Sequence, residues 1–351
     1  MKLRPIVTMA VLVVLAGSVV GAEPAALPTV GSKTAAVSTQ GSAPAEVRIG
    51  VILNYLDDPF FVAIYEGIRA EARRLGARVT VRSVTSNAEL AAQGRQLRAL
   101  SAEGHDCYVV NPITATNLIG ALRQVRGPIV NVDSPVDPDA ASRAGVRITS
   151  YIGTDDFASG RLAGERMAEL LPDGGQVALV GGIADNINSG IRLSGFQEGI
   201  RGSRVEVVAR VNADYNRTKA QIAAERMLRT HPRLAGFFAV SDSMALGIAD
   251  TLRGAGKAGE IEVIGHDGTV AALGLISAGT MSADVSQYPY VMGQMAVEAC
   301  VAAARGESLP ARVDAPIALL TPRNADRALA AFPRPFGPYS DPFRDLVRRS
   351  G

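Results

Sequence analysis

Short apolar runs alternate with amphipathic segments along most of the chain. Residues 47–53 are apolar enough to form a buried strand. Between Phe60 and Leu75, Phe61, Ile64 and Ile68 recur at helical spacing. This spacing predicts a helix whose core-facing stripe includes Phe61, which leaves Phe60 freer to face a cleft.

The same alternation continues in two successive series. Further strands are predicted at 78–84, 106–110, 128–132, 176–180, 205–211, 235–240, 261–264 and 281–285. Helices are predicted between them, at 87–102 with Asn87 as the N-cap, from about 115, and at 155–171, 188–201, 216–230 and 242–253. Such alternation is typical of parallel sheets covered on both faces. We therefore expect an α/β fold with two doubly wound parallel-sheet lobes.

The beginning of the chain departs from this pattern. Lys2 and Arg4 precede an apolar run at 6–20, and small residues follow up to Ala22. This layout predicts a secretory signal peptide at 1–22, cleaved after Ala22. Residues 23–46 are rich in Ala, Pro, Ser and Thr, and are expected to form a flexible leader.

The end of the chain is a Pro- and aromatic-rich tail at 324–351. The stretch from Pro333 to Pro342 contains four prolines, so neither a regular helix nor a central strand is expected there. The tail either lies over the surface or forms an exposed docking segment, and the sequence does not decide between the two.

Charge and cysteine content narrow the classes of function. The chain has 36 basic and 34 acidic residues. Removal of Lys2 and Arg4 with the signal peptide leaves 34 of each, which argues against binding to nucleic acid or anionic membranes. Cys107 and Cys300 can form a disulfide in an oxidising compartment, but both lie in apolar segments where buried thiols are common.

Polar and aromatic residues follow the predicted strands at the points where the strands end. In such sheets ligands bind beyond the carboxyl ends of the strands, so these residues are expected to meet in one cleft. The spacing of these residues along the chain does not match that of known metal-binding motifs. They are Asn54 to Phe61, Asn111 and Pro112, Asp133 and Ser134, Gly181 to Arg192, Asn212 to Tyr215, Ser241 and Asp242, His266 to Gly268, and Ser286 to Pro289.

Several of these side chains suit a small polyhydroxylated ligand. Carboxylates such as those of Asp58, Asp133 and Asp267 accept hydrogen bonds from adjacent hydroxyls. The guanidinium of Arg192 donates to two oxygens, and aromatic faces pack against the C–H faces of a sugar ring. Asp58 also suits the N-cap of the helix that follows it, and both roles can hold together.

Signs of an enzyme are missing from the sequence. It contains no phosphate-binding G-x-x-x-x-G-K-[ST] motif and no G-x-S-x-G motif. The three histidines, His105, His231 and His266, are isolated, and His266 is expected to point away from the cleft because its neighbour Asp267 points into it. No catalytic residue, cofactor or metal is predicted.

Five short stretches carry a family likeness. Between residues 47 and 321 the chain resembles the periplasmic sugar-binding proteins of ABC importers, the ribose/galactose-binding, type I group. The stretches are Asp58-Pro-Phe-Phe61, Arg192-Leu-Ser-Gly-Phe196, Ser241-Asp-Ser-Met-Ala-Leu-Gly247, Ile264-Gly-His-Asp-Gly-Thr269 and Gln287-Tyr-Pro289.

The resemblance implies two lobes joined by a three-segment hinge. The N-terminal lobe would comprise 47–146 and 287–314, and the C-terminal lobe 147–286 and 315–323. The tail at 324–351 has no counterpart in the family core. The resemblance also implies that ten residues line the ligand cleft: Asp58, Phe60, Phe61, Asp133, Ser134, Arg192, Tyr215, Ser241, Asp267 and Gln287.

Three of these ten depart from the ribose-type pattern. Asp58 and Ser241 stand where that pattern has Asn, and Ser134 stands where it has Arg. Asp58 looks more like the hexose-binding branch, but the chain has no Trp for stacking. A pentose, a hexose and a cyclic polyol therefore all remain open as ligands.

The function implied is that of a periplasmic solute-binding protein. It would capture a monosaccharide or similar polyol by hinge closure and deliver it, as a monomer, to the permease of an ABC transporter. The alternative is a periplasmic sensing subunit that presents a sugar-like ligand, nucleoside or autoinducer to a membrane receptor or kinase. Sugar-responsive repressors share this core, but they carry a DNA-binding motif where this chain has its predicted signal peptide.

Overall fold

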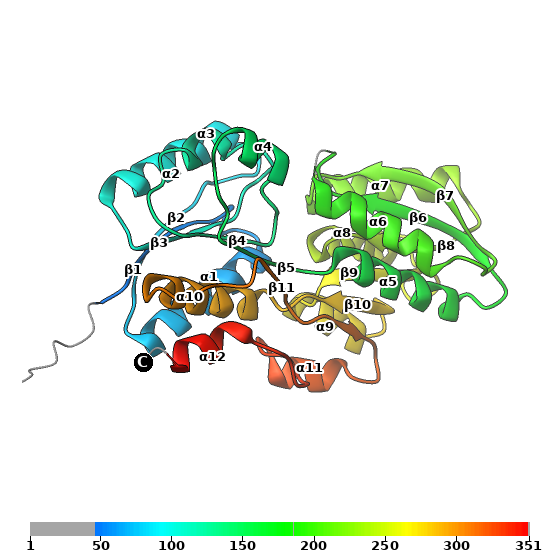
Figure 1. The fold of residues 1–351 in the computed structure, drawn as a ribbon. Coiled ribbons are helices and arrows are strands. Elements are labelled where there is room, and N and C mark those ends of the chain that lie inside the picture. Colours follow the sequence, from blue (N-terminus) through cyan, green and yellow to red (C-terminus); the bar gives the residue numbers. More distant parts are fainter. Residues whose placement is uncertain (1–45, 185, 350–351) are drawn as a thin grey trace, which may run out of the picture. The chain divides into compact units, whose positions relative to one another are not determined.

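The computed structural model describes residues 46–184 and 186–349. The predicted signal peptide at 1–22 and the leader at 23–46, apart from its last residue, lie outside this part. Among the described helices, none combines the length and apolar character needed to cross a membrane. The described chain forms two α/β lobes, each built on a six-stranded sheet (Figure 1).

The sheet of the first lobe has the strand order β11-β5-β4-β3-β1-β2, with every neighbouring pair parallel. All residues of β3 and β4 are buried, as expected for strands with helices on both faces. The strands are β1 (Arg48–Ile52), β2 (Arg78–Arg82), β3 (Cys107–Val110), β4 (Ile129–Val132), β5 (Ser150–Gly153) and β11 (Arg312–Asp314). The helices are α1 (Pro59–Leu75), α2 (Leu90–Glu103), α3 (Ile119–Leu122), α4 (Pro138–Arg143) and α10 (Pro289–Ala304).

The sheet of the second lobe has the order β12-β10-β9-β8-β6-β7 and is parallel except for the edge strand β12. Its strands are β6 (Gly175–Gly181), β7 (Val205–Asn212), β8 (Leu234–Ala239), β9 (Glu262–Asp267), β10 (Ala283–Ser286) and β12 (Ala318–Leu320). Its helices are α5 (Asp156–Leu170), α6 (Ile187–Gly199), α7 (Arg217–Thr230), α8 (Asp242–Gly254) and α9 (Val270–Ser277). The predicted pair of doubly wound lobes is confirmed.

Helix α1 illustrates how local sequence sets the elements. The Asp58 side chain accepts from the backbone N–H of Phe60 at 2.9 Å, and Pro59 occupies the first turn, where no N–H is needed. Gly76 ends the helix in the left-handed conformation at φ 65°. The buried stripe runs through Phe60 rather than Phe61, so our assignment of the inward-facing phenylalanine was wrong.

The chain crosses between the lobes at three places near the sheets. It passes from β5 to α5, from β10 to α10, and from β11 to β12. The first crossing lies later than we expected, because β5 pairs with β4 and so belongs to the first sheet. The expected start of the second lobe at residue 147 is therefore corrected to a point after Gly153.

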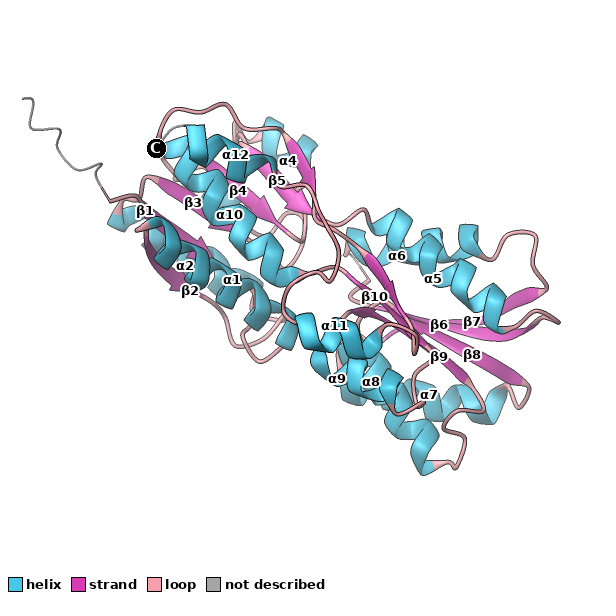
Figure 2. Ribbon diagram, turned by 90° about the horizontal axis from the view of Figure 1, so that it is seen from below, coloured by secondary structure: helices cyan, strands magenta, loops and turns pink. Residues whose placement is uncertain are grey.

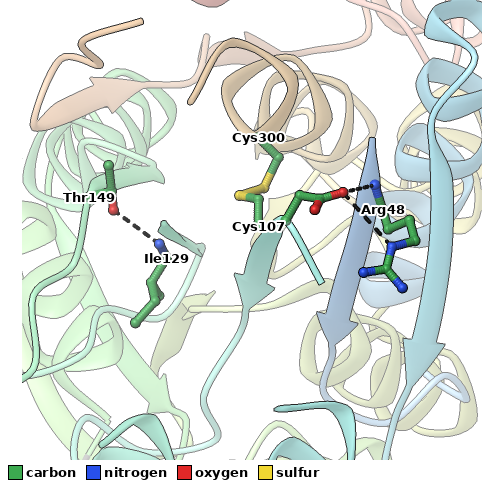
Figure 3. Close-up of a disulfide and its surroundings, with 6 residues drawn as sticks. Arg48, Cys107, Ile129, Thr149 and Cys300 are labelled. Carbon is green, nitrogen blue, oxygen red and sulfur yellow. Dashed lines mark hydrogen bonds and ion pairs between the residues drawn. A yellow bond between two sulfur atoms is a disulfide. The ribbon is translucent and has the colours of Figure 1, made fainter. Parts of the chain in front are cut away.

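Cys107 and Cys300 form a disulfide, although the sequence favoured two buried thiols. Figure 3 shows Cys107 on β3 pointing toward Cys300 on α10. Helix α10 follows the second lobe in sequence but covers the first sheet, and packs against α1. The bridge therefore attaches the returning chain to the centre of the first lobe.

The C-terminal tail is folded at both ends, while residues 332–341, which hold Pro333, Pro335 and Pro338, form neither helix nor strand, as predicted. It contains α11 (Ala325–Ala331) and α12 (Pro342–Arg349), with Pro342 in the first helical position, where proline is tolerated. Figure 2 shows α11 beside α9 of the second lobe and α12 beside α10 of the first. The tail therefore makes a fourth crossing between the lobes.

Buried contacts hold α12 on the first lobe. Phe343 is fully buried in the core of that lobe, and Arg344 donates to the buried Glu298 of α10 at 3.3 Å. Arg74 of α1 donates to the same Glu298 oxygen at 3.1 Å. Burial, together with the nearby carboxylates of Asp341 and Glu71, raises the pKa of Glu298.

We predict that Phe343→Ala lowers the free energy of unfolding by about 3–5 kcal/mol, because it leaves a cavity under α12. Phe332→Ala removes a ring of the same tail that is 39% exposed, and should change stability by less than about 0.5 kcal/mol. Urea unfolding of both variants measures the difference. Equal effects would contradict the packing of α12 described here.

Candidate ligand-binding site

A cavity between the two lobes brings together the residues at the strand ends. All ten residues predicted to bind a ligand line it: Asp58, Phe60, Phe61, Asp133 and Ser134 from the first lobe, Arg192, Tyr215, Ser241 and Asp267 from the second, and Gln287 from the second crossing. The pairing of parallel strands places these residues at one edge of each sheet, as the strand pattern indicated.

Seven further residues line the cavity and were not predicted to bind. Asn87 was assigned as a helix cap, but α2 begins at Leu90 and the Asn87 amide instead donates to the carbonyl of Asp214 at 3.0 Å. Five of the others lie within the strand-end stretches that were expected to meet in the cleft, but nothing in the sequence singled them out as ligand residues, and Ile113 lies just outside those stretches. The seven are Asn54, Tyr55, Asn87, Ile113, Ile183, Asn186 and Asn188.

Arg192 is the centre of a buried polar network. Its Nε donates to Asp156 Oδ1 at 2.6 Å, and its Nη1 donates to the carbonyl of Val240 at 3.0 Å. Its Nη2 donates to Gln287 Oε1 at 3.2 Å. Only 3% of Arg192 is exposed, so these partners fix the direction of the guanidinium toward the cavity. Asp156 was not predicted from the sequence as its partner.

Backbone strain is concentrated at this site. Asp133, Tyr215 and Asp267 line the cavity and have φ values of 58°, 58° and 137°. Such values are uncommon for residues with a side chain, and they persist where the surroundings impose them, most often at functional sites. At the ends of β4 and β9, this conformation accompanies the placement of the Asp133 and Asp267 carboxylates at the cavity wall.

The two strand-end carboxylates are held differently. Asp133 Oδ2 accepts from the Asn111 amide at 3.0 Å and from the Ser134 hydroxyl at 3.2 Å. Asp267 uses both oxygens, accepting from the Gln287 amide at 2.6 Å and from the backbone N–H of Asp242 at 3.1 Å. Burial raises the pKa of each to about 6, while Arg192 acts in the opposite direction.

A second pair of carboxyls lies behind Asp267. Asp242 and Asp284 are buried and face each other, and burial together with Asp284 raises the pKa of Asp242 well above its ordinary value. His266 is also fully buried, with Nε2 3.0 Å from the hydroxyl of Ser159, and burial lowers its pKa well below the ordinary value.

Asp58 serves both as a helix cap and as a contact between the lobes. Its Oδ2 accepts from the hydroxyl of Ser243 on α8 at 3.0 Å and from that of Tyr55 at 3.4 Å. A second contact crosses the cavity where the Asn188 amide donates to the carbonyl of Asp133 at 3.3 Å. Burial and the nearby Asp267 raise the pKa of Asp58 to about 6.

Aromatic rings form the remaining wall. Phe61 meets Phe60 edge-on at 5.3 Å and Tyr55 at 5.6 Å between ring centroids. On the second lobe, the Tyr215 hydroxyl donates to Asn186 Oδ1 at 2.8 Å. A side chain at Gly182 would approach the Tyr215 ring to 2.2 Å, so the glycine leaves room for that ring.

Comparisons with known proteins agree with this architecture. The family model for "Periplasmic binding protein domain" matches residues 49–308. The D-allose-binding periplasmic protein of Escherichia coli is 30% identical over 275 residues, which cover 77% of this chain and 88% of the relative. The ribose import binding protein of Bacillus subtilis is 29% identical over 279 residues, which cover 79% and 88%.

Solved structures show the same fold. An ABC transporter solute-binding protein from Mycobacterium smegmatis with bound glycerol superposes with a TM-score of 0.73 at 29% identity, covering 80% of this chain and 96% of that one. A periplasmic solute-binding protein from Actinobacillus succinogenes with bound D-allose superposes with a TM-score of 0.76 at 23% identity, covering 80% and 100%.

The raised pKa of Asp133 predicts a specific dependence of stability on pH. The folded protein holds this proton more tightly than the unfolded chain, whose carboxyls titrate near 4. Stability therefore falls as the pH rises from about 4 to about 6, and the loss persists above that range. Asp133→Asn lacks this titration and tolerates the positive φ. Its stability relative to the wild type should rise by up to about 3 kcal/mol between pH 4 and pH 7.

Urea unfolding at a series of pH values tests this expectation. The exposed Asp173 supplies the control, since Asp173→Asn should show no change relative to the wild type across the same range. A constant difference between Asp133→Asn and the wild type at every pH would contradict the assigned cost of burying this carboxylate.

Proposed function

Because the chain belongs to the periplasmic binding protein domain family, we propose that it captures a monosaccharide or similar polyol for an ABC importer. The observation that carries this proposal is the convergence of ten polar and aromatic side chains from both lobes on one cavity. The chain is a binding protein and not an enzyme, and its place of action is the periplasm. The predicted signal peptide at 1–22 would direct it there.

The chemistry of the cavity suits a ring of hydroxyl groups. Asp133 and Asp267 are fixed acceptors, and the guanidinium of Arg192 retains N–H groups beyond those donated to Asp156, Val240 and Gln287. Phe60, Phe61 and Tyr215 offer aromatic surface to the C–H faces of a sugar ring. In this proposal, all ten lining residues predicted from the sequence contact the ligand or its immediate partners.

Ligand capture would proceed by hinge closure. The lining residues come from two lobes, so a ligand that binds them all is bound fully only when the lobes are together. Such a ligand selects the closed arrangement, and the membrane permease would recognise that arrangement on a monomeric binding protein. The three crossings near the sheets supply the hinge.

The alternative function, a sensing subunit with the tail as its docking segment, gains no support from the tail. Phe343 and Val347 are buried in the core of the first lobe, while Ala325 and Ala328 are buried in that of the second. The tail at 324–351 is therefore packed into both lobes, and it is not a free segment available for docking.

We predict that Asp267→Asn weakens binding of the natural ligand by roughly 10–100-fold, because a hydrogen bond to a charged acceptor is worth about 1.5–3 kcal/mol. A thermal-shift screen of pentoses, hexoses, inositols and amino sugars would identify the ligand, and calorimetry would measure the affinity. Asp173→Asn changes an exposed carboxylate of the same lobe and should bind like the wild type. Equal affinities of the wild type, Asp267→Asn and Asp173→Asn would mean that the ligand does not bind at Asp267.

We also predict that the identified ligand lowers the radius of gyration in small-angle scattering. Closure brings the lobes together, whereas binding to one lobe alone leaves their separation unchanged. The Asp267→Asn variant should need a ligand concentration that is higher by the same factor as its loss of affinity to reach the same decrease in the radius of gyration. A saturating ligand that leaves the scattering curve unaltered would contradict hinge closure.

A further inference from the structure

The cavity carries an excess of negative charge. Three carboxylates line it, at Asp58, Asp133 and Asp267, and the only cationic side chain among the described lining residues is Arg192. That guanidinium is itself paired with a fourth buried carboxylate, Asp156, at 2.6 Å. Four carboxylates against one guanidinium give a formal charge of 1 − 4 = −3 when all are ionised.

Protein groups compensate this charge unevenly. Arg192 lowers the pKa of both Asp133 and Asp267, and amide and hydroxyl donors reach each of them. The charged group that acts most strongly on Asp58 is another carboxylate, Asp267, which adds to the effect of burial. His266 does not help, because burial keeps its ring neutral. Neutral donors do reach Asp58, from the backbone N–H of Phe60 and the hydroxyls of Ser243 and Tyr55. No cationic side chain is among the groups that act most strongly on it, so Asp58 lacks the charge compensation that Arg192 gives the other two carboxylates.

The charge of Asp58 is not required for the fold. The backbone N–H of Phe60 needs an acceptor oxygen, and asparagine caps helices as well as aspartate does. The positive end of α1 favours a carboxylate there, but burial and Asp267 outweigh it and raise the pKa of Asp58 to about 6. A half-buried carboxylate whose charge the helix does not need is a candidate for pairing with a cation.

The surroundings of Asp58 suit an ammonium group. The rings of Tyr55, Phe60 and Phe61 stand next to it on the same wall, and the electron-rich faces of aromatic rings attract cations. Asp133 Oδ1 accepts no hydrogen bond from the part of the chain that the structure describes, so it is available to a donor on the ligand. Carboxylates and aromatic rings together form a setting for a positively charged, hydroxyl-rich molecule.

We propose that the natural ligand is a polyhydroxylated amine, such as an amino sugar, whose ammonium group binds at Asp58 beside Tyr55 and Phe61. Its hydroxyl groups bind Asp133, Arg192 and Asp267. This inference rests on the proposed function and narrows its ligand class from polyols in general to those that carry one protonated amine.

Matched sets of ligands test this inference. Each set contains a 2-amino-2-deoxyhexose, its N-acetyl derivative, which keeps the nitrogen but loses the charge, and the parent hexose. The gluco, galacto and manno sets are each titrated into the wild-type protein by calorimetry at pH 7. The amine that binds most tightly should have an affinity at least tenfold higher than either neutral member of its set.

Two variants assign the preference to Asp58. Asp58→Asn keeps the cap and the shape but removes the charge. It should reduce the ratio of the affinity for the amine to the affinity for its parent hexose at least tenfold, a readout in which any loss common to both ligands cancels. Asp57→Asn removes the same charge from the exposed neighbouring residue and should bind like the wild type.

The outcomes separate the two proposals. If a parent hexose binds as tightly as its amine or more tightly in every set, the amine inference is overturned and the proposed capture of a monosaccharide stands. If Asp58→Asn keeps the full preference for the amine, the assignment to Asp58 is overturned. If no member of any set binds but a neutral pentose, hexose or inositol of the thermal-shift screen does, the amine inference is overturned and the proposed function stands. If none of the screened sugars and polyols binds, the proposed function fails together with the inference.

Discussion

The buried guanidinium of Arg192 is the interaction on which the site depends. Its three partners come from three separate parts of the chain: Asp156 at the start of α5, Val240 after β8, and Gln287 at the second crossing between the lobes. Asp156 and Gln287 both lie beside segments where the chain changes lobe. One side chain therefore fixes the cavity wall and two of the crossings in a single network. Removing either charge of the pair would leave the other buried alone, which is costly in a protein interior.

The sequence predicted much of the site because the parallel strands impose a simple rule. Asp133 and Asp267 each follow an apolar strand, and a carboxylate at that point has to face the edge where ligands bind. The resemblance supplied Arg192, Tyr215 and Gln287, which the strand pattern alone could not single out. Asn186 and Asn188 were missed because an asparagine at the start of a helix has the same sequence signature whether it caps or lines a cavity.

Other features depended on contacts between distant residues, which a local pattern does not encode. The disulfide joins residues separated by 193 positions, so no local pattern could pair them. Strand β5 contributes only four residues to the first sheet, between β4 and β11, so its membership is decided by its pairing rather than by its own composition. The prolines of the tail correctly excluded helix and strand from residues 333–341, but they carried no signal for the helix that follows. Pro342 in fact starts α12, and only the burial of Phe343 explains why that short helix is stable.

The discontinuity of the first lobe has a consequence for the order in which the protein assembles. The second lobe has most of its core within one continuous stretch, from α5 to β10. The first lobe needs α10 to cover its sheet, Cys300 to reach Cys107, and α12 to fill the space around Phe343. During synthesis or export, which proceed from the N-terminus, the second lobe has nearly all of its parts before the first has its own. The earlier-made half is thus completed last, and until then its central sheet exposes an apolar face that a chaperone can recognise.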